Sequence, residues 1–335
     1  MGSDFVRHLY NKYPKYNLFV LDLLTYAGSL DNLESIVVLE KKKSNGSKRF
    51  FFIKGDICDQ KFVSELFKKY KFDVVVNYAA ESHVDRSIRW DYHFLRSNFL
   101  GVHNLIWLVK KHQIPRFIQI STDEIFGDVL EGFSKEHSPI RPSNPYSASK
   151  AAADILLQSY IRTHKLPIIL VRGSNNFGPY QYPDKLIPLT ITNLLEEGQK
   201  IPIHGNGIQK RMWVHVNDFS SAVDLAMHKA EDFSIYNISG IEMSNLEIVE
   251  KICHVLEKDH KKCIMFVSDR PGGDYRYSLD SSKIKKELGW EIQYPIHKSL
   301  ESVVSWYVKN VQWWKRAKKT KDFKIFYGKQ YKSEY

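Results

Sequence analysis

The chain has 335 residues, of which 43% are hydrophobic and 26% are charged, a balance that excludes a disordered or fibrous protein. The net charge of +11 lies in two segments, since residues 40–49 hold five basic and one acidic side chain and residues 309–335 hold nine and two. The rest of the chain is neutral, so no nucleic-acid-binding groove is expected. We interpret residues 321–335 as a solvated basic tail, with binding of a phosphate or an acidic partner as the alternative.

The sequence contains no run of about 18 apolar residues and no signal-peptide pattern, so neither a transmembrane helix nor membrane association is predicted. Its three cysteines, Cys58, Cys253 and Cys263, lack the spacing of a metal or redox site. We therefore expect no bound metal and no disulfide framework, and we predict a cytoplasmic protein.

Short apolar runs alternate with amphipathic stretches in the first half of the chain. Amphipathic helices are predicted over residues 59–70 and 99–111. The apolar runs are residues 18–21, 50–53, 74–76, 117–120 and 168–171. Runs of this length that end in small or polar residues are typical of parallel strands buried on both faces. The predicted fold class is therefore α/β, with a Rossmann-like doubly wound parallel sheet.

The first predicted strand ends at Asp22, where such folds place the acid that binds the adenosine ribose of NAD. Capping of a turn is the alternative role for Asp22. The glycine turn of the dinucleotide fingerprint belongs about 20 residues upstream, and only Gly2 stands there, followed by a helix predicted over 3–13. The strand before that turn is missing, so we expect two neighbouring strands to remain unpaired. We expect roughly ten further residues, with a glycine turn, ahead of Met1 in a full enzyme.

The pattern of apolar runs loosens after residue 176, where prolines interrupt it. We predict an NAD-binding domain over residues 1–176, which the chain rejoins at about 205–235, near Trp213–Val216. Residues 177–320 are predicted to form mainly a smaller, mixed α/β substrate-binding lobe.

A tyrosine and a lysine lie four residues apart in a predicted helix that begins at Asn144, a good N-cap residue, and Pro145. Tyr146 and Lys150 therefore share one helix face. An ammonium group near a phenol favours the phenolate, which makes the pair a candidate general base for a sugar hydroxyl. An ordinary helix surface is the alternative interpretation.

Two adjacent carboxyl groups follow the strand before this helix, in the sequence Thr122-Asp123-Glu124. Such a pair suits acid–base chemistry when the surroundings push the two pKa values apart. A solvated turn is the alternative interpretation.

Taken together, these motifs resemble the extended short-chain dehydrogenase/reductase superfamily, and within it the dTDP-glucose 4,6-dehydratases. The resemblance runs from Gly2 to about Trp314, and the Thr-Asp-Glu triplet separates the dehydratases from related sugar epimerases. The matching stretches are residues 24–28, 55–59, 79–87, 121–127, 144–150, 174–180, 183–188, 205–213 and 269–272.

The resemblance implies a hydro-lyase that uses NAD to convert dTDP-glucose into its 4-keto-6-deoxy product, by C4 oxidation, water elimination across C5 and C6, and C6 reduction. Tyr146 would take the proton of the C4 hydroxyl, Glu124 would remove the C5 proton, and Asp123 would protonate the departing C6 hydroxyl. Thr122 would hydrogen-bond the C4 oxygen, and Lys150 would hold the nicotinamide ribose.

The resemblance also implies two sets of binding residues. The NAD contacts are Gly2, Asp22, Leu23, Leu24, Thr25, Asp56, Ile57, Tyr78, Ala79, Ala80, Ser82, Ser97, Tyr146, Lys150 and Asn176. The nucleotide-sugar contacts are Ser82, Thr122, Asn175, Lys185, Leu186, Pro202, His204, Arg211, Asn245, Asp269 and Arg270. Arginines suit a diphosphate because a guanidinium binds phosphate oxygens bidentately.

Other functions remain open on the sequence. A UDP-glucose 4,6-dehydratase is the nearest variant, and a nucleotide-sugar epimerase or decarboxylase is a more distant one. Because the glycine turn is missing, a truncated, inactive homologue that acts as a binding or dimerisation partner is a further alternative. The resemblance implies a homodimer.

Overall fold

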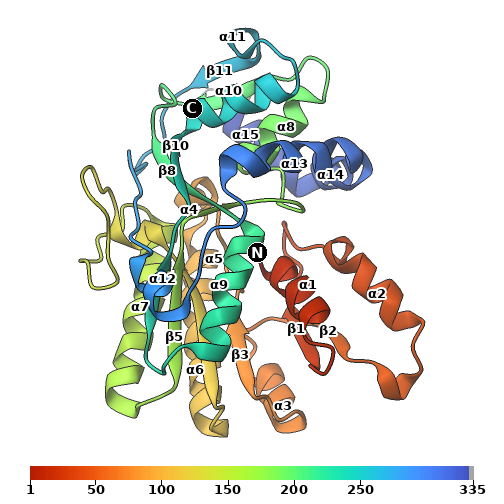
Figure 1. The fold of residues 1–335 in the computed structure, drawn as a ribbon, viewed down its shortest axis with the longest axis vertical. Coiled ribbons are helices and arrows are strands. Elements are labelled where there is room, and N and C mark those ends of the chain that lie inside the picture. The colour runs from red at the N-terminus through yellow and green to blue at the C-terminus, as the bar shows by residue number, and fades with distance from the viewer. Residues whose placement is uncertain (332–335) are drawn as a thin grey trace.

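A computed structural model describes residues 1–331, in which a smaller lobe sits above a larger one (Figure 1). The larger lobe contains α1 (Gly2–Lys12), β1 (Leu18–Asp22), α2 (Glu34–Lys41), β2 (Phe50–Lys54), α3 (Gln60–Lys69), β3 (Val74–Asn77), α4 (Val84–Arg89), α5 (Asp91–Leu95), α6 (Gly101–His112), β4 (Arg116–Thr122), α7 (Pro145–His164), β5 (Ile168–Gly173), α9 (Val216–Lys229), β9 (Ile235–Ile238) and α12 (Ser282–Leu288). The smaller lobe contains β6 (Asn175–Phe177), α8 (Leu186–Leu194), β7 (Ile201–His204), β8 (Lys210–His215), β10 (Ile241–Ser244), α10 (Asn245–Val255), α11 (His260–Cys263), β11 (Ile264–Val267), α13 (Ile296–Lys309), α14 (Val311–Lys319) and α15 (Lys321–Tyr331). Short 3₁₀ turns cover Leu30–Leu33, Asn45–Ser47 and Asp123–Phe126, and a π-helical turn covers Arg96–Leu100.

The centre of the larger lobe is a four-stranded parallel sheet in the order β3-β4-β5-β9. Successive residues of β4 point to opposite faces. Ile118 and Ile120 pack with α1, α9 and α12, whereas Phe117 packs with α3, α6 and α7 on the other face. Helices cover both faces of a parallel sheet, which is the predicted doubly wound α/β fold, and that prediction is confirmed.

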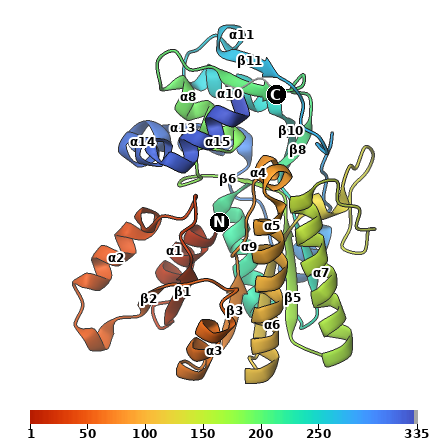
Figure 2. The same cartoon turned by 180° about the vertical axis from the view of Figure 1, so that it is seen from behind.

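The strands β1 and β2 form a separate two-stranded parallel sheet. Within residues 1–331, neither strand is hydrogen-bonded to β3, as was expected from the missing strand. Figure 2 shows this unit, with α1 and α2, beside the edge strand β3. The prediction of burial on both faces holds for β4 and β5 but is wrong for β1 and β2, where Phe51 is 37% exposed. A two-stranded sheet, unpaired along both outer edges, has too few neighbours to cover its side chains.

The smaller lobe has two small sheets, β10-β8-β6 and β11-β7. We expected the chain to rejoin the main sheet near Trp213–Val216, and this is wrong because that segment includes the end of β8, which pairs with β6 and β10. The chain instead returns through α9 and then β9, whose residues Ile235–Ile238 pair with β5. Trp290, after α12, also packs into the core of the larger lobe.

The C-terminal segment is not simply a solvated tail. Residues 321–331 form α15, and Phe323 and Phe326 are buried. Arg86 of α4 pairs with Asp322 at 2.6 Å, and its guanidinium lies 4.2 Å from the Phe326 ring centre. Burial of these apolar side chains docks α15 on the protein despite its basic composition. The end of the predicted tail, residues 332–335, lies outside the described residues. No helix within residues 1–331 is both long and apolar enough to cross a membrane.

Candidate active site

One continuous cavity of about 1270 Å³ lies at the carboxyl ends of the parallel strands and extends between the two lobes. Ligands of open α/β sheets bind at this edge, because the loops after the strands converge there. Every binding and catalytic residue predicted above lines the cavity except Asp269. Asp269 instead accepts a hydrogen bond from Gln209 Nε2 at 3.2 Å, next to Arg270, which does line it.

The carboxyl pair lies where β4 ends and a 3₁₀ turn begins. Thr122 caps this turn: its Oγ1 accepts from the Glu124 amide at 3.3 Å and donates to Asp123 Oδ1 at 3.2 Å. Asp123 is 3% exposed, and its Oδ2 has no hydrogen-bond partner among the described residues. The solvated-turn interpretation is therefore wrong for Asp123.

The two carboxyl groups lie in different electrostatic surroundings. Burial, followed by the nearby Glu124 charge, raises the pKa of Asp123 to about 8. Burial also raises the pKa of Glu124, but Lys185, Arg211 and Arg270 oppose that rise. Asp123 therefore carries its proton at neutral pH, whereas the cationic groups favour the ionised form of Glu124. Such a difference suits one group to donate a proton and the other to accept one.

Tyr146 and Lys150 lie in the first turns of α7, whose start is fixed by a capping box between Asn144 and Ser147. Both side chains are buried, so the incidental-surface interpretation is wrong. Lys150 Nζ donates to the carbonyl oxygen of Ile120 at 2.6 Å, and burial lowers its pKa to about 8.

The expected stabilisation of the Tyr146 phenolate by Lys150 is not found. Burial and the negative charges of Glu124 and Asp123 raise the pKa of Tyr146, while a hydrogen bond with Thr122 opposes the rise. The Lys150 ammonium donates to a backbone carbonyl, and the negative charges of two carboxyl groups act on the phenol. In this arrangement the neutral form of Tyr146 is favoured.

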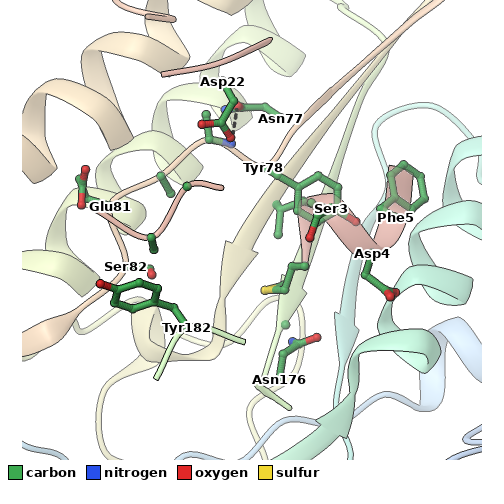
Figure 3. Close-up of a pocket in the computed structure, with 18 of the residues that line it drawn as sticks. Ser3, Asp4, Phe5, Asp22, Asn77, Tyr78, Glu81, Ser82, Asn176 and Tyr182 are labelled. Carbon is green, nitrogen blue, oxygen red and sulfur yellow. Dashed lines mark hydrogen bonds between the residues drawn. The ribbon is translucent and has the colours of Figure 1, made fainter. Parts of the chain in front are cut away.

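The larger-lobe half of the cavity carries polar groups suited to a dinucleotide. Asp22 is exposed at the end of β1, and its Oδ1 accepts from the Leu24 amide at 2.7 Å in a turn where Leu24 has φ of 55°. Figure 3 shows Asp22, Asn77 and Tyr78 along one side of this region, with Asn176 opposite. Among the described residues, the Tyr78 hydroxyl and the Asn176 side-chain oxygen are buried without hydrogen-bond partners.

Asp56 and Gly2 also line the larger-lobe half of the cavity. Asp56 already pairs with Arg96 at 2.6 Å, and it also accepts from the Cys58 amide at 2.8 Å. Gly2 begins α1 against Tyr78, where an added Cβ would lie 3.4 Å from the tyrosine Cβ. The N-terminal turn of α1 therefore faces the cavity, as the position of a phosphate-binding helix requires.

The smaller-lobe half is cationic. Arg270 lies 3.3 Å from Asp85, and Lys185 donates to the Ser82 carbonyl at 2.8 Å. Arg211 is held by the carbonyl oxygens of residues 210, 274 and 275, with its guanidinium 4.2 Å from the Tyr277 ring centre. Three cations whose charges act on Glu124 form a site for an anionic group such as a diphosphate.

Two tyrosines at this site were not predicted from the sequence. The Tyr277 hydroxyl donates to Asp274 at 2.7 Å and lies 3.4 Å from Glu124 Oε2. Tyr331 enters the cavity from α15, with its ring 5.9 Å from that of His204. Neither belongs to a periodic pattern: Tyr277 is placed by the bridge between Lys210 and Arg276, and Tyr331 by the docking of α15.

The sheet, the acid after β1 and the buried Tyr146–Lys150 pair define an enzyme of the extended short-chain dehydrogenase/reductase class. A family model described as GDP-mannose 4,6 dehydratase matches residues 1–303. A dTDP-glucose 4,6-dehydratase of Streptomyces niveus is 40% identical over 329 residues, which cover 95% of this chain and 93% of that protein. The chain belongs to this family of nucleotide-sugar 4,6-dehydratases.

Solved structures of relatives agree in fold. The dTDP-glucose 4,6-dehydratase of Bacillus anthracis, in complex with NAD, has a TM-score of 0.85 and 40% identity, covering 94% of this chain and 96% of that one. DesIV of Streptomyces venezuelae, a dTDP-glucose 4,6-dehydratase with NAD and TYD bound, has a TM-score of 0.87 and 38% identity at the same coverage.

Proposed function

We propose that this protein catalyses the NAD-dependent dehydration of dTDP-glucose to the 4-keto-6-deoxy sugar nucleotide, a reaction of deoxysugar biosynthesis. The observation that carries the proposal is the pair Asp123 and Glu124, two adjacent carboxyl groups whose pKa values are set by different surroundings. Elimination of water across C5 and C6 needs a base for the C5 proton and an acid for the departing hydroxyl. An epimerase needs neither group.

The roles follow from the protonation states. Asp123, protonated at neutral pH, donates its proton to the C6 hydroxyl as that group leaves. Glu124 lies among Lys185, Arg211 and Arg270, which favour its ionised form, and it takes the proton from C5. Thr122 holds the C4 oxygen, because its hydroxyl already lies between Asp123 and Tyr146.

The residues of the larger-lobe half fit NAD. Asp22 is exposed at the end of β1 and would bind the adenosine ribose, and the Tyr78 hydroxyl and Asn176 oxygen, unpartnered among the described residues, would hydrogen-bond a polar ligand. When bound, NAD would supply the redox chemistry, as acceptor of the C4 hydride and as its donor to C6. Tyr146 would take the proton of the C4 hydroxyl in its phenolate form, which a neighbouring positive charge favours. Lys150 would hold the nicotinamide ribose.

The cations of the smaller-lobe half bind the sugar nucleotide through its diphosphate. Arg211 and Arg270 are held by backbone carbonyls and by Asp85, so their donors are oriented before the ligand arrives. Preorganised guanidinium groups give bidentate contacts at a low entropic cost. These contacts are common to dTDP and UDP sugars, and a UDP-glucose 4,6-dehydratase is therefore the second candidate.

Incubation with NAD and either dTDP-glucose or UDP-glucose tests the proposal. We expect the dTDP sugar to give a 4-keto-6-deoxy product, identified by mass spectrometry as the loss of one water. Faster turnover of UDP-glucose would assign the second candidate, and a product that only inverts C4 would contradict dehydration. Absence of bound NAD from the purified protein, together with no turnover of either sugar, would indicate the inactive binding partner instead.

We also propose that the protein is a homodimer in the cytoplasm. The neighbouring α5, π-turn and α7 expose large apolar side chains: Tyr92 is 65% exposed, Leu95 46%, Leu100 51% and Ile155 54%. An exposed apolar patch of this kind is typical of an interface between copies of a chain. A Leu100→Glu variant should then have half the mass of the wild type by light scattering. Leu39→Glu, at a 50% exposed leucine of α2, is the control and should remain dimeric. The cytoplasm suits three cysteines that are all free thiols.

A further inference from the structure

The segment that follows β1, residues 23–33, forms much of the larger-lobe wall of the cavity. Nearly all of its residues line the cavity, and the NAD contacts predicted directly after Asp22 belong to it. Residues 23–33 contain no strand, and their backbone–backbone hydrogen bonds are short turns, such as that from the Gly28 amide to the Thr25 carbonyl at 2.9 Å. Short turns fix the shape of a segment but not its place on the protein. Its place therefore depends on side chains that contact it from neighbouring elements.

Tyr26 of this segment is joined to α15 through Arg86 of α4. Arg86 is 7% exposed, and its guanidinium lies 3.8 Å from the ring centre of Tyr26 and 4.2 Å from that of Phe326. The same guanidinium donates to both carboxylate oxygens of Asp322, at 3.2 and 2.6 Å. Each ring attracts the cation, and a bidentate pair with a carboxylate fixes its orientation. One buried cation thus links residues 23–33 to two side chains of α15.

A second contact joins the same two elements. Tyr182, in the loop before α8, has its ring centre 5.5 Å from that of Tyr26 and 6.1 Å from that of Phe323 in α15. Figure 3 shows Tyr182 beside Ser82 at the pocket. Tyr26 is therefore contacted by an arginine and by a tyrosine, each of which itself packs on α15.

The other end of the segment is held by α14. Trp313 Nε1 donates to the Asn32 side-chain oxygen at 3.0 Å, and Arg316 pairs with Asp31 at 2.8 Å. The Arg316–Asp31 pair is exposed to solvent, so it adds little. Asn32 is also held from α1, because Arg7 donates to its carbonyl oxygen at 2.6 Å. Trp313 is therefore the main contact that α14 makes with this end.

We propose that α14 and α15 form a clasp on residues 23–33, and that Asp322, Arg86 and Trp313 are positioning residues for NAD. The inference rests on the proposed function, because the segment bears on the reaction only through NAD. The apparent affinity of a ligand falls with the fraction of molecules whose site has the binding-competent arrangement. Loosening the clasp should therefore weaken NAD binding and leave the acid–base groups at the end of β4 unchanged.

Asp322→Asn tests the clasp at a side chain that is 47% exposed, where the fold should tolerate a substitution. The change removes the counter-ion of Arg86, and a buried cation without its partner is unfavourable. Because Arg86 then no longer holds Tyr26 against α15, we expect the Kd for NAD, measured by calorimetry, to rise at least about fivefold. Asp322→Glu keeps the carboxylate and should remain within about twofold of the wild type.

The matched control is Asp232→Asn. It removes the partner of Arg116 from an ion pair of 3.1 Å in which Asp232 is 42% exposed, and neither residue lines the cavity. Its Kd for NAD should equal that of the wild type.

Two further readouts distinguish positioning from a general loss of stability. At saturating NAD, the kcat of Asp322→Asn should stay within about twofold of the wild type while the KM for NAD rises. Amide hydrogen exchange in residues 23–33 should become at least about fivefold faster, with β4 and β5 unchanged. Trp313→Phe, which keeps a ring but removes the N–H donor to Asn32, should have the same two effects. By linkage, NAD should slow exchange in α15 of the wild type.

The outcomes separate the clasp from the proposed function. Unchanged NAD affinity and unchanged exchange in both variants would overturn the clasp. A loss of kcat at saturating NAD, or faster exchange throughout β4 and β5, would show a general structural role and overturn it as well. Faster exchange confined to residues 23–33 in a protein that binds no NAD would contradict the proposed function alone.

Discussion

Replacement of Asp123 by asparagine should stabilise the protein at neutral and alkaline pH while removing its catalytic acid. The Asp123→Asn side chain has nearly the same shape, and its amide oxygen still accepts from Thr122. The atom that replaces Oδ2 remains without a partner among the described residues, as Oδ2 is now. The substitution therefore changes mainly the ability of this position to ionise.

The size of the effect follows from the pKa of Asp123, which burial raises from 3.8 to about 8. Between these pH values the unfolded chain loses the proton and the folded chain keeps it, so the stability present below pH 3.8 is lost as the pH rises toward 8. At about 1.4 kcal/mol per pH unit, folding of the wild type pays on the order of 4 kcal/mol at pH 7, which asparagine avoids.

Urea denaturation of the wild type and of Asp123→Asn at pH 5 and pH 8 measures this difference. We expect the stability advantage of the variant to grow by about 4 kcal/mol over that interval, since three pH units separate the two conditions. Asp73→Asn, at an exposed aspartate, is the control and should show no such pH-dependent gain. An advantage that is equal at both pH values would refute the protonated state of Asp123, and so its role as an acid.

The other predictions concern the same cavity. Dehydration by the wild type should slow as the pH rises through about 8, because the acid form of Asp123 is lost, and a rate that rises throughout this range would contradict that assignment. Glu124→Gln should lower kcat by about 10²–10⁴-fold and leave KM within about threefold; an unchanged rate of C5 deuterium exchange would exclude it as the base. Arg270→Ala should raise KM for the sugar nucleotide more than it lowers kcat, and the opposite split would argue against a diphosphate contact. Phe326→Ala should cost about 3–5 kcal/mol in urea unfolding because its ring is 2% exposed, whereas a cost near zero would show that α15 is not docked.

The sequence was sufficient to predict most of the main sheet, because β4 and β5 each contain a short, largely apolar run and are buried on both faces. The helix at Tyr146 was equally predictable, since the Asn144 cap and Pro145 fix its start locally. β6 was not predicted, because it is a three-residue strand held by β8 and gives no periodic signal. Local sequence patterns thus identify strands and helices whose own residues signal burial. They miss a strand that forms only by pairing with another strand distant in the sequence.

The residues that line the cavity could be predicted from sequence motifs, but the shifts in their pKa values could not. Lys150 was expected to lower the pKa of Tyr146, and it instead donates to the Ile120 carbonyl, a backbone group whose direction no sequence pattern reveals. The docking of α15 had a visible signal, because Phe323 and Phe326 are three residues apart and share a helix face. The net positive charge of that segment favoured the prediction of a solvated tail instead.

The separation of β1–β2 from the main sheet and the chemistry at Asp123 concern different parts of one cavity. Thr122, Asp123 and Glu124 end β4, which is paired on both sides by β3 and β5. Asp22 ends β1, which pairs with β2. The proposed acid–base groups are therefore held by a strand that is paired on both sides, whereas Asp22, the acid proposed to bind the ribose, ends a strand that is paired along one edge only among the described residues. A substitution that perturbs the β1–β2 unit should thus change NAD affinity far more than it changes the pKa of Asp123.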